Sequence, residues 1–195
     1  CLEFLHGNPD SLKVVDPVMG DNGKPYSTYT PELIRRMKEL VDAADVITPN
    51  LTETCMLLGE ECPPVMSVAQ ARSWLARLSD KPGIVVIKGV PLIDDDGQKL
   101  SNVGFDKESG SFWRIDWDHI PVHYPGTGDI FTSVLTASLL KGESLPIALN
   151  RATTFTEIAV KTTYSYGTEP RLGVLFEDCL SWLMTNTVLC DYRKL

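Results

Sequence analysis

Short apolar segments typical of β-strands alternate with amphipathic segments typical of α-helices in this sequence of 195 residues. Alternation of this kind indicates an α/β fold with a mainly parallel central sheet. We expect strands at residues 12–16, 46–48 and 83–88, a hairpin of strands at 100–105 and 112–115, and helices at 31–43, 53–58, 68–78, 126–140, 145–164 and 174–184. Because no repeat or linker interrupts the pattern, the sequence predicts a single domain over residues 1–195.

Residues that favour the start or the end of a helix flank several of these segments. Thr30 stands directly before Pro31, and Ser67 stands directly before the helix expected at 68–78. Threonine and serine side chains cap helix N-termini, and proline is favoured at the first helical position. Gly59 follows the helix expected at 53–58 and is a typical helix stop.

The charge and hydropathy of the chain exclude several classes of function. Asp and Glu number 26 against 18 Lys and Arg, which gives a formal net charge of −8. Binding to nucleic acids or anionic membranes draws on positive surfaces, so neither is expected. The longest apolar segments without charge, 130–140 and 179–190, are shorter than the roughly 18 residues that a membrane span requires. With 43% hydrophobic residues the chain is expected to form an ordinary globular core.

The cysteine pattern indicates a reducing compartment. Five cysteines are scattered along the chain, and none of them forms a C-x-x-C pair. An odd, dispersed set suggests neither a disulfide framework nor a zinc site. We therefore expect a cytoplasmic protein.

A glycine-flanked turn, Pro125-Gly126-Thr127-Gly128-Asp129, leads directly into the helix expected at 126–140. Glycines let a backbone approach an anion closely, and the first N–H groups of a helix carry a partial positive charge. Gly126, Thr127 and Gly128 are therefore candidates for an anion hole. A carboxylate beside such a site repels the anion unless a proton moves there, so Asp129 is either a catalytic group or an acid that stabilises the helix start.

Two carboxylates follow the first expected strand, in the segment Asp16-Pro-Val-Met-Gly-Asp21. Carboxylates at a strand end can hold Mg²⁺ through water, and the glycine-containing loop after them can close over a nucleotide. The alternative is that Asp16 and Asp21 only organise turns.

The next expected strand ends in Thr48-Pro-Asn-Leu-Thr-Glu53. Asn50 and Glu53 are three residues apart, which places both side chains on one face of the following helix. They either serve a ligand site or form a capping box, in which each side chain accepts a hydrogen bond from the backbone N–H of the other residue.

Four segments occur in this order along the chain: DPVMGD at 16–21, ITPNLTE at 47–53, VVIKG at 85–89 and GTGD at 126–129. Together with the tail at 163–171, they resemble the ribokinase superfamily and, more narrowly, the pyridoxal (pyridoxine, pyridoxamine) kinases. The resemblance covers residues 2–176. It implies a ribokinase-like three-layer α/β/α fold.

The resemblance implies an ATP-dependent phosphotransferase that acts on the hydroxymethyl group of pyridoxal or a related B6 vitamer. In such an enzyme Asp129 takes the proton from the hydroxymethyl group, whose oxygen then attacks the γ-phosphate of ATP. Residues 126–128 form the anion hole for the transferring phosphoryl group. The implied partners are this small-molecule substrate, ATP, Mg²⁺ and K⁺, with homodimers expected in the full-length family.

The same resemblance assigns the remaining polar residues to the phosphates and cations. Asp16 and Asp21 are expected near the ATP phosphates, and Asn50 and Glu53 are expected to arrange Mg²⁺ and its water. Asp16, Asp21 and Glu53 are thus the candidate metal ligands, partly through water. Residues 20–26 are expected to form a loop over the site.

Lys88 departs from the pattern of the vitamin B6 kinases, which often carry Thr or Ser at this strand end, near a monovalent-cation site. The hydroxymethylpyrimidine kinases of thiamine synthesis are similar to this chain in having a Lys-Gly pair, here Lys88-Gly89. An ammonium group there would replace a bound K⁺ or contact an ATP phosphate as a point charge. We therefore hypothesise a weak dependence on K⁺, the alternative being a lysine that extends into solvent.

Two rival functions stay open. Lys88-Gly89 favours a hydroxymethylpyrimidine kinase, whereas many such enzymes carry Cys where this chain has Asp129. The resemblance also implies a sizeable portion of the family domain before the DPVMGD strand, so we expect an N-terminally truncated, partial kinase domain. The second rival is accordingly a catalytically incomplete fragment that binds nucleotide without turnover.

Overall fold

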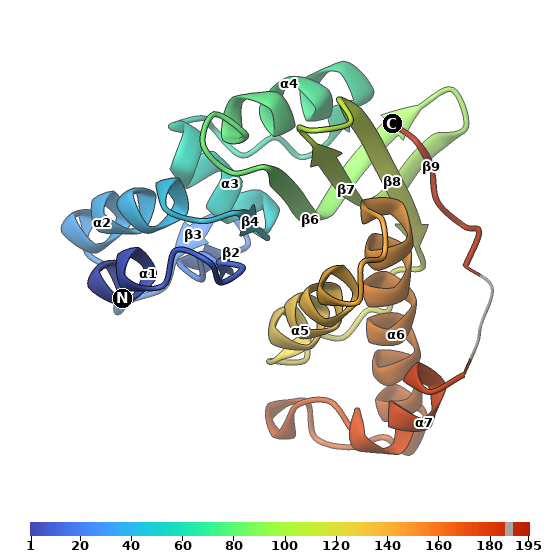
Figure 1. Ribbon diagram of the computed structural model, residues 1–195. Helices are drawn as coiled ribbons and strands as arrows, with labels where there is room; N and C mark the ends of the chain where they lie inside the picture. The colour runs from blue at the N-terminus through green and yellow to red at the C-terminus, as the bar shows by residue number, and fades with distance from the viewer. Residues whose placement is uncertain (186–188) are drawn as a thin grey trace.

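A mixed β-sheet lies between two layers of helices in the computed structural model, which describes residues 1–185 and 189–195 (Figure 1). Its strands, in sheet order, are β1 (Val14–Val15), β4 (Val46–Ile47), β6 (Ile84–Asp94), β7 (Gly97–Asp106), β8 (Ser111–Trp117) and β9 (Arg193–Lys194). The short strand β5 (Met66–Ser67) pairs with the far part of β6. The expected three-layer α/β/α arrangement is confirmed.

The direction of strand pairing changes at β6. Strands β1, β4 and β6 are parallel, and β5 is parallel to β6 as well. On its other edge β6 pairs with β7 in antiparallel fashion, and β7, β8 and β9 continue in this way. The predicted hairpin is therefore present and longer than expected. The parallel strands are the ones whose ends carry the candidate site residues, in agreement with the rule that open α/β sheets bind ligands at such ends.

Helices cover both faces of the sheet. Helices α2 (Pro31–Asp42), α3 (Leu51–Leu58) and α4 (Val68–Leu78) share one hydrophobic core with the sheet, and α5 (Thr127–Leu140) and α6 (Leu145–Tyr166) share the other. In Figure 1, α4 lies above the sheet, and α5 and α6 lie below it. Neighbouring residues of one strand serve the two cores, because side chains alternate along a strand: Val46 packs towards α5 and α6, and Ile47 towards α2, α3 and α4.

The expected helix caps are present. The Thr30 hydroxyl accepts a hydrogen bond from Leu33 N at 3.3 Å, and the Ser67 hydroxyl accepts one from Gln70 N at 3.2 Å. Gly59 ends α3 with a left-handed φ of 70°. The starts of α2 and α4 are thus confirmed, whereas α3 begins two residues earlier than expected.

The loop expected at residues 20–26 contains a small hairpin of its own. Strands β2 (Gly20–Asp21) and β3 (Lys24–Pro25) are antiparallel, and the turn between them has positive φ at Asn22 and Gly23. This turn geometry matches the natural twist of paired strands and favours asparagine and glycine. A Cβ atom at Gly20 would collide with the Lys24 carbonyl oxygen, so the close approach of the two strands requires glycine there.

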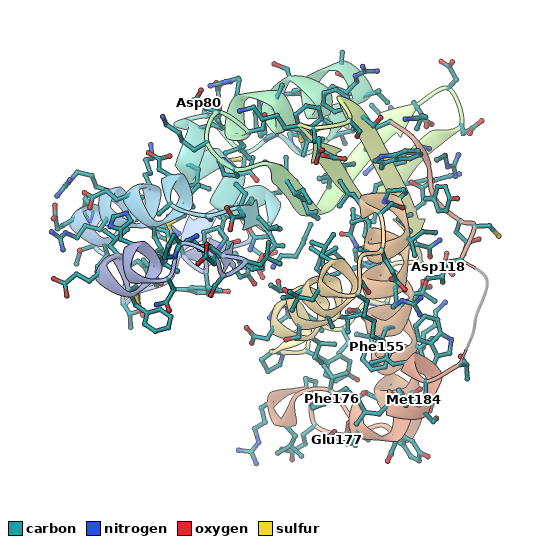
Figure 2. The ribbon with its side chains drawn as sticks, in the orientation of Figure 1. Asp80, Asp118, Phe155, Phe176, Glu177 and Met184 are labelled. Atoms are coloured by element: carbon teal, nitrogen blue, oxygen red, sulfur yellow. The ribbon has the colours of Figure 1, made fainter. Side chains whose placement is uncertain are left out.

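The prediction of a single helix at 174–184 is wrong. Instead of one helix, the segment contains the 3₁₀ turn η2 (Glu177–Cys179) and the short helix α7 (Leu180–Leu183), after the 3₁₀ turn η1 (Pro170–Leu172). Val174 and Phe176 pack against the core below the sheet, and Figure 2 shows Phe176 beneath Phe155 of α6. Packing of these apolar side chains onto α6 replaces a continuous helix, a tertiary effect that apolar spacing alone does not reveal.

The remaining helix, α1 (Leu2–Gly7), was not expected from the sequence. It buries none of its residues, so hydrophobic spacing gives no signal for it. Within residues 1–185 and 189–195, none of the helices combines the length and the apolar character needed to cross a bilayer.

Two leucines of α5 provide a test of the core below the sheet. Leu135 is fully buried, whereas Leu140 is 68% exposed. Leu135→Ala is expected to lower the free energy of unfolding by about 2–5 kcal/mol, because it removes buried methyl groups and leaves a cavity. Leu140→Ala, the matched control, is expected to change it by less than about 0.5 kcal/mol. Urea unfolding followed by circular dichroism measures both, and equal losses would contradict the assigned burial.

Candidate active site

A cleft of about 1240 Å³ opens where the parallel strands end. Its walls come from the β2–β3 hairpin, the segment between β8 and α5, the first turn of α5, and α6. Every residue that the sequence analysis assigned to the site lines this cleft, namely Asp16, Asp21, Asn50, Glu53, Lys88, Gly89, Gly126, Thr127, Gly128 and Asp129. The structure therefore brings together residues that are up to 113 positions apart in the sequence, from Asp16 to Asp129.

An ion pair lies at the floor of the cleft. The Lys88 ammonium lies 2.9 Å from both carboxylate oxygens of Asp16, and the two side chains are only 15% and 13% exposed. Asp16 directly follows β1. Lys88 lies in β6 just beyond the residues that pair with β4, and the Lys88 backbone N–H donates to Pro49 O at 2.9 Å. The alternative of a lysine extending into solvent is therefore wrong.

The glycine turn before α5 lies directly against this ion pair. A Cβ atom at Gly128 would be 3.2 Å from Lys88 Nζ and 3.6 Å from Asp16 Oδ2. Gly126 has φ of 89°, and none of the described side chains caps the start of α5 by a hydrogen bond. The first N–H groups of the helix thus lack a side-chain acceptor, and the anion hole at residues 126–128 stays a prediction.

Asp129 lies in the first turn of α5 with an exposed side chain. Within the described part of the chain its carboxylate accepts no hydrogen bond and forms no ion pair, and it lines the cleft. It does not cap the helix by a hydrogen bond, so its remaining roles are a favourable interaction with the helix dipole and chemistry in the cleft.

The first turn of α3 forms a capping box and also holds the loop after β1. Asn50 Oδ1 accepts from Glu53 N at 2.8 Å, and Glu53 Oε2 accepts from Asn50 N at 2.7 Å. Glu53 Oε1 accepts in addition from Met19 N at 3.2 Å, and Asn50 Nδ2 donates to Gly20 O at 2.8 Å. The capping-box interpretation is correct, and the same two side chains also position the start of the β2–β3 hairpin.

The environment of Glu53 changes its proton affinity. The side chain is buried, and burial raises the pKa of Glu53 to about 7, although the Asn50 N–H and the Lys88 charge act in the opposite direction. A carboxyl group of this kind exchanges a proton near neutral pH.

Thr52 and Asn102 also shape the cleft, although the sequence analysis did not select them. The Thr52 hydroxyl accepts from Gly23 N at 2.9 Å and so fixes the tip of the hairpin. Asn102 of β7 is buried, accepts from Gly89 N at 2.9 Å and donates to Thr153 Oγ1 of α6 at 3.0 Å. β7 carries several polar residues, among them Gln98, Lys99 and Ser101, so nothing in the sequence singled out Asn102 as an amide with buried partners.

The Asp16 and Glu53 carboxylates of the cleft already have partners within the protein. In the described ranges no cluster of three or more His, Cys, Asp or Glu side chains is suited to hold a metal directly. Both oxygens of Asp16 contact Lys88, and both oxygens of Glu53 accept backbone N–H groups. Mg²⁺ in nucleotide sites keeps several waters and binds mainly through phosphates, so this set of donors fits such an ion through water and does not form an all-protein cage.

A family model described as phosphomethylpyrimidine kinase matches residues 3–172. The chain belongs to this family of α/β kinases. Among curated relatives it is 29% identical over 165 residues to a hydroxymethylpyrimidine/phosphomethylpyrimidine kinase of Haemophilus influenzae, which covers 85% of this chain and 61% of that protein. It is also 31% identical over 146 residues to a pyridoxal kinase of Rubrobacter xylanophilus, covering 73% of this chain and 48% of that protein.

A solved structure has the same fold at higher identity. It is a candidate phosphomethylpyrimidine kinase from Bacteroides thetaiotaomicron in a crystal form with pyridoxal, 40% identical, with a TM-score of 0.91 over 99% of this chain and 68% of that one. The resemblance to the vitamin B6 kinases and their superfamily is confirmed by these matches. The chain spans 61% and 41% of the lengths of the first two curated relatives it matches.

The raised pKa of Glu53 predicts a pH dependence of stability. In the folded state the Glu53 carboxyl group keeps its proton up to about pH 7, whereas an ordinary glutamic acid, with a pKa of 4.5, loses its proton at lower pH. This group therefore stabilises the fold fully below about pH 4.5, and the contribution, on the order of 3 kcal/mol, is lost as the pH rises to about 7.

Glu53→Gln removes this titration. Urea unfolding at several pH values between about 5 and 8 is expected to show a smaller decline of stability in Glu53→Gln than in the wild type. Identical declines in both proteins would contradict the assignment of the titration to Glu53.

Proposed function

We propose that this protein uses ATP to phosphorylate the hydroxymethyl group of pyridoxal or a related B6 vitamer. One observation carries the proposal: the free Asp129 carboxylate lies at the start of α5 beside an uncapped glycine turn, and both line a cleft that contains the Asp16–Lys88 ion pair. A base next to an anion site is what transfer of a phosphoryl group to a hydroxyl requires.

The reaction proceeds by in-line displacement. Asp129 accepts the proton of the hydroxymethyl group as its oxygen attacks the γ-phosphorus, a new P–O bond forms, and the bond from the γ-phosphorus to the bridging oxygen breaks to leave ADP. The N–H groups at residues 126–128 donate to the oxygens of the transferring group, where negative charge is concentrated in the transition state. The helix dipole of α5 acts in the same direction.

Positive charge in the cleft comes from Lys88 and from the cation that accompanies ATP. Lys88 is fixed by Asp16 next to Gly128, so its ammonium faces the turn that receives the phosphoryl group. Mg²⁺, when bound to the phosphates, neutralises their charge. Asp16, Asp21 and Glu53 would hold its water ligands, and Asn50 orients Glu53.

The comparisons and the thiols support the substrate and the compartment. Relatives that carry the name pyridoxal kinase, and a 40% identical structure in a crystal form with pyridoxal, support a B6 vitamer as the substrate. All five cysteines are free thiols, which supports the cytoplasm as the compartment. A homodimer is the assembly that the family resemblance favours.

The second candidate is phosphorylation of hydroxymethylpyrimidine or its phosphate. The Lys88-Gly89 pair favours it, as do the description of the matching family and the Haemophilus influenzae relative. Asp129 favours the B6 vitamer, because many hydroxymethylpyrimidine kinases carry Cys at this position.

Asp129→Asn tests the proposed base. Purified protein with ATP and Mg²⁺ is incubated with pyridoxal or with hydroxymethylpyrimidine, and the phosphorylated product is followed by mass spectrometry. We expect product from pyridoxal and a loss of at least about 100-fold in kcat for Asp129→Asn, since the amide cannot accept the proton.

The control is Asp42→Asn, which changes an exposed acid at the end of α2 and is expected to keep full activity. Product from the pyrimidine alone would move the function to the second candidate. ATP binding without product from either substrate would contradict both kinase functions.

Lys88→Thr tests whether the ammonium takes the place of a monovalent cation. Initial rates with and without KCl at constant ionic strength are expected to show little stimulation of the wild type and a larger stimulation of Lys88→Thr, because the shorter side chain leaves room for a cation beside Asp16. Lys141→Thr, at the exposed end of α5, is the matched control. Equal stimulation of the wild type and Lys88→Thr would refute the idea.

A further inference from the structure

Two threonine hydroxyls link the buried end of β4 to the Asp16 carboxylate. Thr48 directly follows β4 and is fully buried, and its Oγ1 lies 2.9 Å from Thr132 Oγ1. Thr132 Oγ1 lies 3.3 Å from Asp16 Oδ2, the oxygen that also contacts Lys88. The line of contacts therefore runs from Thr48 through Thr132 and Asp16 to Lys88.

The chemistry of the groups fixes the direction of the hydrogen bonds. An ionised carboxylate only accepts, so the single hydroxyl hydrogen of Thr132 points to Asp16. Thr132 then accepts from Thr48, whose hydrogen points to Thr132. Each hydroxyl in this series of hydrogen bonds polarises the next. The series ends at the negatively charged Asp16 carboxylate, which holds Lys88.

Thr132 differs from other threonines of the helices below the sheet. Thr136, Thr153 and Thr156 each donate to the carbonyl oxygen four residues earlier in their own helix, at 2.7–2.8 Å. A threonine in a helix satisfies its hydroxyl in this way without any outside partner. The hydroxyl of Thr132 instead bonds to Asp16 and Thr48, which are 116 and 84 residues away in the sequence.

The position of Thr132 gives this contact a consequence for the site. Thr132 lies three residues after Asp129, so the two side chains are neighbours on the surface of α5. Gly128 packs against the Lys88 ammonium on the same turn. A bond from Thr132 to Asp16 thus holds the turn that carries the base and the anion hole against the ends of β1 and β4.

We propose that Thr132 is a positioning residue for phosphoryl transfer, which acts through Asp16 and Lys88 and does not touch the substrate. The inference rests on the proposed kinase function. Thr132 sets the distance between the Lys88 ammonium and the first turn of α5. Thr48 holds the Thr132 hydroxyl in place through the hydrogen bond between the two threonines.

Thr132→Val replaces the hydroxyl by a methyl group of similar size. We expect kcat to fall about tenfold, the effect of losing one hydrogen bond to a charged group, with less than about a twofold change in KM for ATP. Thr132→Ser keeps the hydroxyl and is expected to restore kcat to within about twofold of the wild type. Thr136→Val, on the next turn of α5, removes a hydroxyl whose hydrogen bond within the described residues stays inside the helix, and it is the matched control.

Thr48→Val separates positioning from a general loss of packing. Without Thr48, Thr132 still donates to Asp16, so the fall in kcat is expected to be smaller than for Thr132→Val. The double variant is expected to be no slower than Thr132→Val alone, because Thr48 acts only through Thr132. Urea midpoints of all variants show that the proteins compared are folded.

The outcomes are distinct. An active wild type with an unimpaired Thr132→Val, a Thr132→Ser variant as slow as Thr132→Val, or an equal loss in Thr136→Val would each overturn the positioning role. A wild type that phosphorylates neither pyridoxal nor hydroxymethylpyrimidine would overturn the proposed function, and the positioning role with it.

Discussion

The site depends on the contact between Lys88 and Asp16. Neither side chain is more than 15% exposed, so each charge would be costly to bury without the other. The pair joins the end of β1 to β6 and leaves the ammonium facing Gly128 at the start of α5. The ion pair thus lies where β1, β6 and the start of α5 meet, although these elements are far apart in the sequence. Because Asp16 balances its charge, the Lys88 ammonium can remain there in the absence of any ligand.

The first turn of α3 shows how a structural motif and a ligand site use the same atoms. Asn50 and Glu53 satisfy each other as a capping box, and their remaining polar atoms hold Met19 and Gly20 at the base of the hairpin. The sequence analysis treated capping and function as alternatives. A motif that organises a helix end at the edge of a parallel sheet necessarily faces the ligand crevice, so the two roles do not compete.

Local signals explain what could be predicted from the sequence. Strand ends and the glycine turn are recognisable from consecutive residues, and all of the site residues that they indicated line the cleft. Thr52, Asn102 and Thr132 were missed because their partners lie in other elements, and a threonine in a helix carries no sign of its partner. The segment at 174–184 was predicted wrongly for the same reason, since its apolar side chains pack onto α6 and do not form one helix. The chemical roles of the cleft residues stay predictions.

The change of pairing direction at β6 has a consequence for the order of folding. The antiparallel strands β6, β7 and β8 are joined by short turns. The parallel strands β1, β4 and β6 are joined by longer connections that contain helices, and they pair only after these connections have brought them together. Contacts between distant parts of a chain form at a greater cost in loop entropy than local ones. We therefore expect the hairpin unit to form early and the cleft to be assembled late, so that the proposed kinase activity would report the completion of folding rather than its start.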